Sequence, residues 1–405
     1  MSVAQAQRGC EMAAKATQQV GRIAALQKLG QSLWLDNIRR QFITSGELAR
    51  LRDEGVTGVT SNPTIFEKAV SGSSDYEQAL ARLAGAGRTA QEILWDLMVE
   101  DIQGAADVFR PVFDRTGGGD GYVSIEVSPD VASDTTRTIA MAEDLRRRCA
   151  RPNVMVKIPA TSEGIPAIRD QIAKGHNINV TLIFSVDRYA EVVEAFLSGL
   201  EELQRRGGDV SRVASVASFF VSRMDTKVDG RLRTMIAAAA DADERKALQE
   251  LLGKAGIANS KIAYQRFKEL HSGPRWEALS RAGARVQRCL WASTSAKDPT
   301  YPDTMYVEEL IGPDTINTVP NHTLAAFADH GKVCRSLDDD VAGARRHLGK
   351  LAEHDIDLLE ITRELEVEGV GGFEKSYESL TEVLGQAVQR IGAGKPLKKA
   401  DRGER

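Results

Sequence analysis

The sequence is poor in the residues that build metal sites and disulfide frameworks. Only four cysteines and six histidines occur among its 405 residues. No two cysteines form a CxxC pair and no two histidines have the HExxH spacing, so neither a zinc site nor a disulfide framework is predicted. The cysteines lie far apart in the chain, at Cys10, Cys149, Cys289 and Cys334.

Signals for secretion, membranes and polyanions are also missing. No run approaches the ~18 apolar residues of a membrane span. Arg8, Glu11 and Lys15 interrupt the stretch where a signal peptide would have its hydrophobic core. Lys and Arg number 53 against 57 Asp and Glu, a net charge of −4, so a general affinity for nucleic acid is not expected. These absences predict a cytoplasmic protein whose partners include neither membranes nor nucleic acids.

Eight short β-branched or apolar runs alternate with helical patterns along the chain. Strands separated by helices in this number predict a parallel (β/α)8 TIM barrel. A doubly wound open sheet is the structural alternative, but no GxGxxG or P-loop motif follows the first strand. The runs fall at 32–38, 56–60, 122–127, 154–159, 177–184, 213–220, 286–294 and 315–319.

The chain is longer than the ~250 residues typical of such a barrel. The excess falls in an N-terminal helix over 3–29, in a helical region between the sixth and seventh strands, and in C-terminal helices within 321–391. No linker divides these parts, so residues 1–392 are predicted to form one barrel domain with helical additions and 393–405 a flexible charged tail. Helix starts are predicted at four Ser/Thr-x-x-Glu capping boxes, which begin at Thr44, Thr64, Ser74 and Thr89.

One cation interrupts the fourth predicted strand. Lys157 lies within the otherwise apolar run Val154-Met155-Val156-Lys157-Ile158-Pro159. An ammonium group in an apolar site is costly, so burial favours the neutral amine, which can attack a carbonyl group and form a Schiff base. The alternative is an edge lysine whose stem lies on the sheet while its charged end reaches solvent.

Other polar residues fall at or near the carboxyl ends of successive strands. In a parallel barrel both faces of each strand are buried, so polar residues there need a reason, and the carboxyl ends form the rim where active sites lie. Side chains alternate in direction along a strand, which places residues two apart on the same face. The residues that converge on this rim with Lys157 are Asp36, Asn62, Glu126, Asn179, Thr181 and Ser218.

Each of these residues also has a purely structural interpretation. Asp36 could cap the following helix, Asn62 could be a turn residue, and Glu126 would face solvent if the strand register shifted by one. The polar residues of the fifth and sixth strands could serve packing and hydrogen bonding alone. A serine triad is not supported, because no GxSxG elbow is present. A lysine ringed by two acids and neutral donors is, however, the equipment for carbonyl chemistry through a Schiff base.

The sequence resembles the transaldolase family, in its longer bacterial form. The resemblance runs from about Ser32 to the C-terminal helices, and it is the order of the motifs, rather than any single one, that is specific. These motifs are Leu35-Asp36, Thr60-Ser61-Asn62-Pro63, Glu126-Val127, Val156-Lys157-Ile158-Pro159-Ala160-Thr161, Asn179-Val180-Thr181-Leu182-Ile183-Phe184-Ser185, and Ser218 followed by Arg223.

The resemblance implies a role for each residue of the rim. Lys157 would form the Schiff base with a ketose phosphate, and Asp36 would take the proton of the C4 hydroxyl as the C3–C4 bond breaks. Glu126 would act as acid and base through a water held by Thr181. The remaining residues would hold the substrate: Asn62 and Asn179 its hydroxyls or the three-carbon unit, Thr60 and Ser218 the pocket wall, and Arg223 the phosphate.

The reaction implied is transfer of a dihydroxyacetone unit in the non-oxidative pentose phosphate pathway. Sedoheptulose 7-phosphate and glyceraldehyde 3-phosphate would give erythrose 4-phosphate and fructose 6-phosphate, with no metal or organic cofactor. The sequence departs from the family after the seventh strand, where Ser-x-Arg is common and this chain has Ser293-Thr294-Ser295-Ala296-Lys297. Lys297 would then replace the arginine as a second phosphate ligand, as a point charge rather than a planar fork.

Two other functions remain open from the sequence. A fructose-6-phosphate aldolase shares the Schiff-base chemistry and releases free dihydroxyacetone, but those relatives are shorter and have glutamine where this chain has Glu126. A catalytically inactive barrel kept as a binding module is the alternative of another class, against which the intact Lys157, Asp36 and Glu126 argue. Both a monomer and a homodimer are compatible with the sequence.

Overall fold

A computed structural model describes residues 21–71 and 73–392. Its centre is a closed barrel of eight parallel strands in chain order, in which β8 pairs with β1. The prediction of a (β/α)8 barrel is therefore confirmed. The strands are β1 Gln31–Leu35, β2 Gly58–Val59, β3 Val123–Glu126, β4 Val154–Pro159, β5 Ile178–Ile183, β6 Ser215–Phe220, β7 Arg288–Ala292 and β8 Thr315–Val319.

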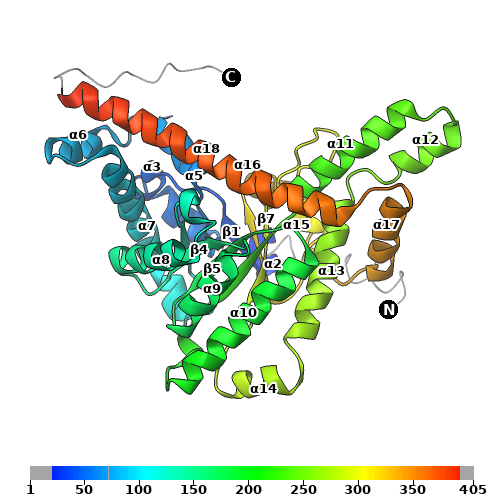
Figure 1. Cartoon of the computed structure of the whole chain (residues 1–405), viewed down its shortest axis with the longest axis horizontal. Helices are drawn as coiled ribbons and strands as arrows, with labels where there is room; N and C mark the ends of the chain where they lie inside the picture. The colour runs from blue at the N-terminus through cyan, green and yellow to red at the C-terminus, as the bar shows by residue number, and fades with distance from the viewer. Residues whose placement is uncertain (1–20, 72, 393–405) are drawn as a thin grey trace.

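Helices cover the outside of the barrel and bury the apolar faces that the strand sequences present. Long amphipathic helices pack against the sheet and against one another (Figure 1). Buried side chains such as Phe109, Phe196 and Phe219 lie between these helices and the strands. The covering helices include α7 Ala90–Arg115, α8 Thr135–Cys149, α9 Gly164–Ala173, α10 Val186–Arg205, α13 Ala255–Leu270 and α16 Asn321–His330.

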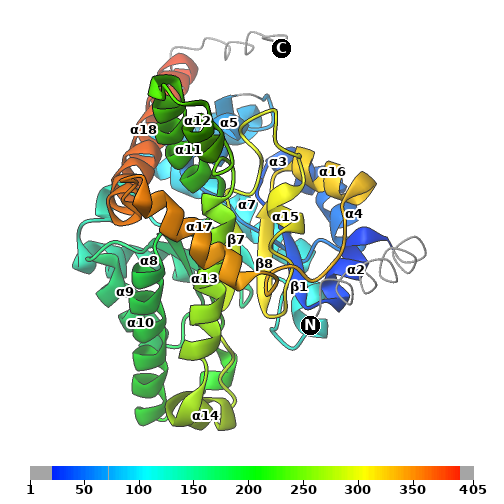
Figure 2. The ribbon, with the colours of Figure 1, turned by 90° about the vertical axis from the view of Figure 1, so that its right-hand side faces the viewer.

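The helical additions predicted from the length lie at both ends of the barrel. Helix α2, Arg22–Lys28, precedes β1, while the predicted residues 3–20 of that helix and the tail 393–405 lie outside the described residues. Between β6 and β7 come α11 Ser222–Ala238, α12 Ala242–Gln249, α13 and α14 Gly273–Arg281. Helix α11 packs against the C-terminal helix and against α12, and Figure 2 shows α14 at the opposite end of the molecule.

The C-terminal helix α18, Leu358–Gly392, lies over the carboxyl ends of the strands. It follows α17, Val341–Glu353, and contacts α5 Pro63–Ser71, α6 Glu77–Gly85, α7, α11 and β5. In Figure 1 it runs in orange and red along one side of the molecule, from α17 to α6. The mouth of the barrel is thus covered by a segment from the far end of the sequence.

One of the four predicted capping boxes forms. At the start of α7 the Thr89 hydroxyl accepts the Glu92 amide hydrogen, and the Glu92 carboxylate accepts that of Thr89. The other three predictions are wrong, because each helix begins at a different residue from the one predicted. Thr44 ends α3, Arg40–Thr44, and a left-handed Gly46 begins α4, Glu47–Asp53. Helix α5 already begins at Pro63, so Thr64 lies inside it, and Tyr76 rather than Ser74 precedes α6.

The cysteines and the apolar segments give two further results. Cys149 and Cys289 are buried free thiols, but Cys334 is disulfide-bonded, contrary to the expectation from cysteine spacing. Within the described ranges no helix is both long and apolar enough to cross a membrane.

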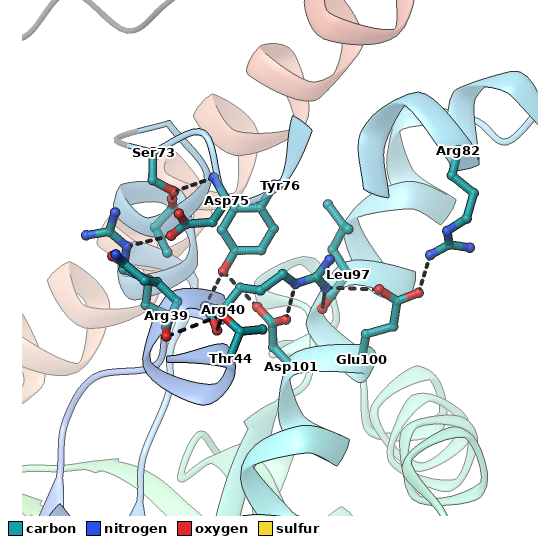
Figure 3. Close-up of polar contacts among 12 residues, drawn as sticks. Arg39, Arg40, Thr44, Ser73, Asp75, Tyr76, Arg82, Leu97, Glu100 and Asp101 are labelled. Carbon is teal, nitrogen blue, oxygen red and sulfur yellow. Dashed lines mark hydrogen bonds and ion pairs between the residues drawn. The ribbon is translucent and has the colours of Figure 1, made fainter. Parts of the chain in front are cut away.

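A buried ion-pair network anchors the segment that follows β1 (Figure 3). Arg40 donates from Nε to Asp101 at 2.7 Å, and the hydroxyl of Tyr76 donates to the same carboxylate at 2.7 Å. The Arg40 guanidinium also lies over the Tyr76 ring, 4.9 Å from its centroid. Next to it, Arg39 pairs with Asp75 at 2.9 Å. These contacts fix α3, and with it the strand end that carries Asp36, to α6 and α7.

Candidate active site

Lys157 lies inside the barrel and not at an exposed edge. Strand register aligns it with Glu126 of β3 on one side and with Asn179 of β5 on the other. Its Nζ donates to Glu126 Oε2 at 3.1 Å and to the Ser61 carbonyl at 3.3 Å, and the residue is only 4% exposed. The interpretation of Lys157 as a lysine that reaches solvent is therefore wrong.

Asp36 is the first residue after β1. Its backbone N–H still bonds the Val319 carbonyl at 2.8 Å, which holds it at the rim. Its side chain accepts a hydrogen bond of 2.7 Å from the Thr60 hydroxyl, which lies 2.6 Å from that of Thr318. Helix α3 has no side-chain cap, so the capping interpretation of Asp36 is wrong.

Burial raises the pKa of the Asp36 carboxyl group, against the opposing effect of nearby cations. Removal from water is the largest influence, and Lys157, Lys297 and Arg223 act in the opposite direction together with the Thr60 hydrogen bond. Three cations from three different strands or their following segments thus act on one carboxyl group. A carboxyl group with a raised pKa exchanges its proton closer to neutral pH than a free aspartate does.

Glu126 shares this electrostatic setting. Burial raises its pKa, while the charge and hydrogen bond of Lys157, and the charge of Arg223, oppose the shift. The residue is 2% exposed, and its Oε1 is buried with no hydrogen-bond partner within the described residues. The hydroxyl of Thr181 is buried and unpartnered in the same way. Glu126 faces the barrel interior, so the alternative of a solvent-facing acid is wrong.

A hydrogen-bonded chain fixes the amide of Asn179. Its Nδ2 donates to the Ser124 hydroxyl at 3.0 Å, and its Oδ1 accepts from the Ser218 hydroxyl at 2.7 Å. Asn179 therefore has one defined orientation beside Lys157. Asn62 is different, because its Oδ1 accepts the Ile65 amide hydrogen at 3.0 Å and so helps to begin α5.

A bulge distorts β5 just beyond Thr181. The register with β6 shifts between Val180 and Ile183, and Leu182 takes the left-handed conformation with φ of 59°. A bulge bends a strand and changes the direction of its side chains, and strained backbone of this kind is frequent at functional sites. No sequence signal marked this position, because leucine normally avoids positive φ.

The phosphate-binding residues expected from the sequence line a cavity of about 600 Å³ at the rim. Arg223, Ser293 and Lys297 share it with the outer residues Lys227 and Glu368. Burial is the largest influence on the pKa values of Arg223 and Lys297, and it lowers both. The carboxyl groups of Glu126 and Asp36 act to raise the pKa of Arg223. For Lys297, the charge of Arg223 lowers the pKa further and Asp36 acts to raise it. The Lys297 ammonium donates to Ser295 Oγ at 2.6 Å, and Ser293 has a left-handed backbone with φ of 54°.

Several residues of the site escaped the sequence analysis. Phe373 of α18 lies near Lys157, the carbonyl of Ser61 accepts from that lysine, and Thr318 and Ser124 extend the hydrogen-bond network. Phe373 gave no local signal, since it is one apolar residue of a long amphipathic helix. In the part of the chain that the structure describes, His, Cys, Asp and Glu side chains form no group that could hold a metal ion.

A parallel barrel with a buried lysine and two carboxyl groups at the carboxyl ends of its strands belongs to the class of (β/α)8-barrel enzymes that work at this rim. The chain matches the family model described as Transaldolase/Fructose-6-phosphate aldolase over residues 33–384. It therefore belongs to that family.

Proteins named transaldolase resemble this chain over almost their whole length. It is 48% identical to one from Thermobifida fusca over 373 residues, which cover 91% of this chain and 98% of that protein. The identity to one from Parafrankia sp. is 47% over 364 residues, covering 89% and 96%. A protein from Saccharopolyspora erythraea is 46% identical over 373 residues, covering 91% and 98%. The family and these names support a transaldolase function.

Proposed function

We propose that this protein transfers a dihydroxyacetone unit between sugar phosphates through a Schiff base on Lys157. The observation that carries the proposal is the position of Lys157, 4% exposed and 3.1 Å from Glu126 inside the barrel. The donors are ketose phosphates such as sedoheptulose 7-phosphate and fructose 6-phosphate, and the acceptors are glyceraldehyde 3-phosphate and erythrose 4-phosphate.

Formation of the Schiff base is the work of Lys157 and Glu126. The neutral amine of Lys157 attacks the C2 carbonyl of the ketose and gives a carbinolamine, which loses water to become an iminium ion. Glu126 supplies the proton that leaves with the hydroxyl group, through a water that also contacts Thr181. The raised pKa of Glu126 and the unpartnered Glu126 Oε1 and Thr181 hydroxyl support this assignment.

Bond cleavage is the work of Asp36. It takes the proton of the C4 hydroxyl while the C3–C4 bond breaks, and the iminium ion receives the electron pair of that bond. The first aldose leaves, and the enamine that remains on Lys157 then adds to the acceptor aldehyde as Asp36 returns the proton. The raised pKa of Asp36 suits it to accept and return a proton within one turnover.

Neutral and cationic side chains hold the substrate in this proposal. Asn179 and Asn62 bind hydroxyl groups of the three-carbon unit, and Thr60 and Ser218 line the pocket. The terminal phosphate binds in the rim cavity of about 600 Å³, which Arg223, Ser293 and Lys297 line. Guanidinium and ammonium groups are the usual protein ligands of phosphate.

Borohydride trapping tests the proposal directly. Reduction in the presence of fructose 6-phosphate should fix a covalent adduct, and peptide mapping should place it on Lys157. Lys157→Met should remove both the adduct and turnover without unfolding the protein. Lys261 of α13 is a matched control, because it is also buried, at 8% exposure, and Lys261→Met should retain both.

Two outcomes would favour the alternative functions. The absence of any adduct at saturating fructose 6-phosphate would favour a catalytically inactive binding module. Free dihydroxyacetone accumulating from fructose 6-phosphate as fast as transfer would instead favour an aldolase.

A further inference from the structure

A single aromatic side chain of the C-terminal helix lies over two basic side chains of the proposed site, Lys157 and Arg223. The ring of Phe373 has its centroid 5.9 Å from Lys157 Nζ and 5.8 Å from Arg223 Cζ. Phe373 is only 4% exposed, although α18 lies at the outside of the barrel mouth. It therefore points inward and forms part of the wall around the proposed nucleophile.

Helix α18 packs closely against the rim of the barrel. A Cβ atom at Gly369, one turn before Phe373, would lie 2.9 Å from Leu182 Cδ2 and 3.7 Å from Arg223 Nη1. The glycine lets the helix approach the strained position of β5 this closely. The position of the Phe373 ring over the site is consequently set by the backbone of α18.

Ion pairs and hydrogen bonds hold α18 in place on both sides of Phe373. Before it, Arg231 of α11 pairs with Glu360 and Glu364 at 3.0 and 2.9 Å, and Lys227 pairs with Glu364 at 2.9 Å and with Glu368. After it, Ser376 lies 2.8 Å from the Thr64 hydroxyl, and the Tyr377 hydroxyl accepts from Trp95 Nε1 at 3.2 Å.

We propose that Phe373 is a shielding residue that keeps water away from the three-carbon unit on Lys157, and so decides between its transfer and its release. This inference rests on the proposed Schiff-base chemistry. The ring presents an apolar surface above Lys157, where water would otherwise reach the bound unit. Phe373 acts on the fate of the intermediate and takes no part in proton transfer.

The competing reaction consumes one water molecule and no net proton, because the proton that the enamine takes up is released again when water adds to the iminium ion. The enamine is protonated on the carbon that would have attacked the acceptor, which gives the iminium ion of dihydroxyacetone. Water then adds to the iminium carbon, the C–N bond of the carbinolamine breaks, and free dihydroxyacetone and the Lys157 amine result. The two fates diverge at the enamine, whose carbon takes either a proton or the acceptor aldehyde, and hydrolysis of an iminium ion follows in both cases. Water above Lys157 delivers that proton, so a wetter site raises release relative to transfer.

The test measures the ratio of free dihydroxyacetone to sedoheptulose 7-phosphate formed from fructose 6-phosphate and erythrose 4-phosphate. We expect Phe373→Ala to raise this ratio on the order of tenfold, which corresponds to about 1.4 kcal/mol between the two barriers. Phe373→Leu, which keeps an apolar side chain over Lys157, should give an intermediate ratio. Both variants should still form the borohydride-trapped adduct on Lys157.

Tyr377→Ala is the matched control. This residue lies one turn further along α18 and contacts Trp95 of α7, at a ring-centroid distance of 6.1 Å, so its loss loosens the helix without removing the ring over Lys157. The ratio should remain that of the unaltered protein. If it rises as much as in Phe373→Ala, general loosening of α18 explains the effect and the assignment to Phe373 is wrong.

Each further result has one meaning. An unchanged ratio in Phe373→Ala with an intact adduct would overturn the inference. If Phe373→Ala does not fold, the ratio in Phe373→Leu decides, and a value equal to that of the unaltered protein would overturn it equally. If the unaltered protein forms no adduct on Lys157, the proposed function itself fails, and this outcome is separate from the role of Phe373.

Discussion

Glu126 and Asp36 are the two carboxyl groups of the proposed site, and they differ in their hydrogen-bond partners. Asp36 accepts from the Thr60 hydroxyl, whereas Glu126 accepts from Lys157 Nζ and its second oxygen has no hydrogen-bond partner among the described residues. A neutral partner fixes the geometry of Asp36 and leaves its charge free to change. The direct contact of Glu126 with Lys157 instead suits proton transfer during the steps that form and break the Schiff base.

Glu126→Gln tests whether Glu126 transfers the proton during formation of the Schiff base. The amide keeps the shape of the side chain but cannot give up or take a proton, so we expect kcat to fall by about 10²–10⁴. Trapping of the adduct on Lys157 should become correspondingly slower, measured as the rate of borohydride-dependent inactivation. The exposed Glu54, which pairs with Arg50 on α4, supplies the control Glu54→Gln, for which both rates should be unchanged. An unchanged kcat in Glu126→Gln would exclude it as the acid.

Lys297 lines the rim cavity together with Arg223, and its substitution tests phosphate binding. Loss of a hydrogen bond to a charged group costs about 1.5–3 kcal/mol. We therefore expect Lys297→Met to raise KM for fructose 6-phosphate by about 10–100-fold with little change in kcat. Lys297→Arg should retain a low KM, because a guanidinium also binds phosphate. A fall in kcat at constant KM would instead connect Lys297 with the chemical steps.

The segment after β1 owes its position to one buried ion pair. Arg40 and Asp101 are joined at 2.7 Å, and the Asp101 side chain is only 2% exposed. Removal of one partner of such a pair leaves an uncompensated buried charge, which destabilises proteins by about 3–5 kcal/mol. We expect Arg40→Ala to lower the free energy of unfolding by about this amount, measured by urea denaturation.

The neighbouring Arg39 provides the control for this prediction. It pairs with Asp75 at 2.9 Å, but its side chain is 35% exposed. Exposed pairs contribute about 0–1 kcal/mol, so Arg39→Ala should change stability little. Equal effects of the two substitutions would show that burial of the Asp101 carboxylate does not govern the energetics here.

Sequence patterns predicted well those elements whose bounds do not depend on contacts with distant parts of the chain. The bounds of β4 and β8 agree with the predicted runs 154–159 and 315–319, because continuous apolar or β-branched segments suit a parallel barrel. The convergence of Lys157, Glu126 and Asn179 followed from the same logic, since strand register aligns them.

The elements that were not predicted depend on distant contacts. Gly46 in a left-handed conformation displaces the expected start at Thr44, and the bulge at Leu182 has no local cause in the sequence of β5. The contact of Phe373 with Lys157 joins positions more than two hundred residues apart. No periodicity within 358–392 could have indicated that this helix completes the site.

In the molecule as a whole, the barrel strands carry the residues of the proposed active site and the C-terminal helix lies over the mouth of the barrel. Lys157, Glu126 and Asn179 come from adjacent strands, while α18 is tied to α11 on one side and to α5 and α7 on the other. Helix α11 also connects the site with the loop after β7. The buried Asp229 accepts from the Tyr301 hydroxyl at 2.6 Å, which holds the segment that follows Lys297.

Asp225 also lies on α11, and its ionisation makes the stability of the folded protein depend on pH. It is buried, accepts the Gly256 amide hydrogen and the Tyr306 hydroxyl, both at 2.7 Å, and lies near Asp229. Burial is the largest influence and raises the pKa of Asp225 from 3.8 to about 6, against the opposing effect of these two hydrogen bonds. The folded protein thus binds a proton at Asp225 more tightly than the unfolded chain does.

Linkage fixes the sign of the effect on stability. Between pH 4 and 6 the folded state holds more protons at Asp225 than the unfolded state, so this group makes the protein less stable as pH rises through that window. A difference of about two pKa units corresponds to about 3 kcal/mol. Asp225→Asn cannot ionise, so its free energy of unfolding should fall less steeply between pH 4 and 7 than that of the unaltered protein. Urea denaturation at several pH values measures the two slopes. Equal slopes would mean that Asp225 titrates alike in both states and that its burial carries no electrostatic cost.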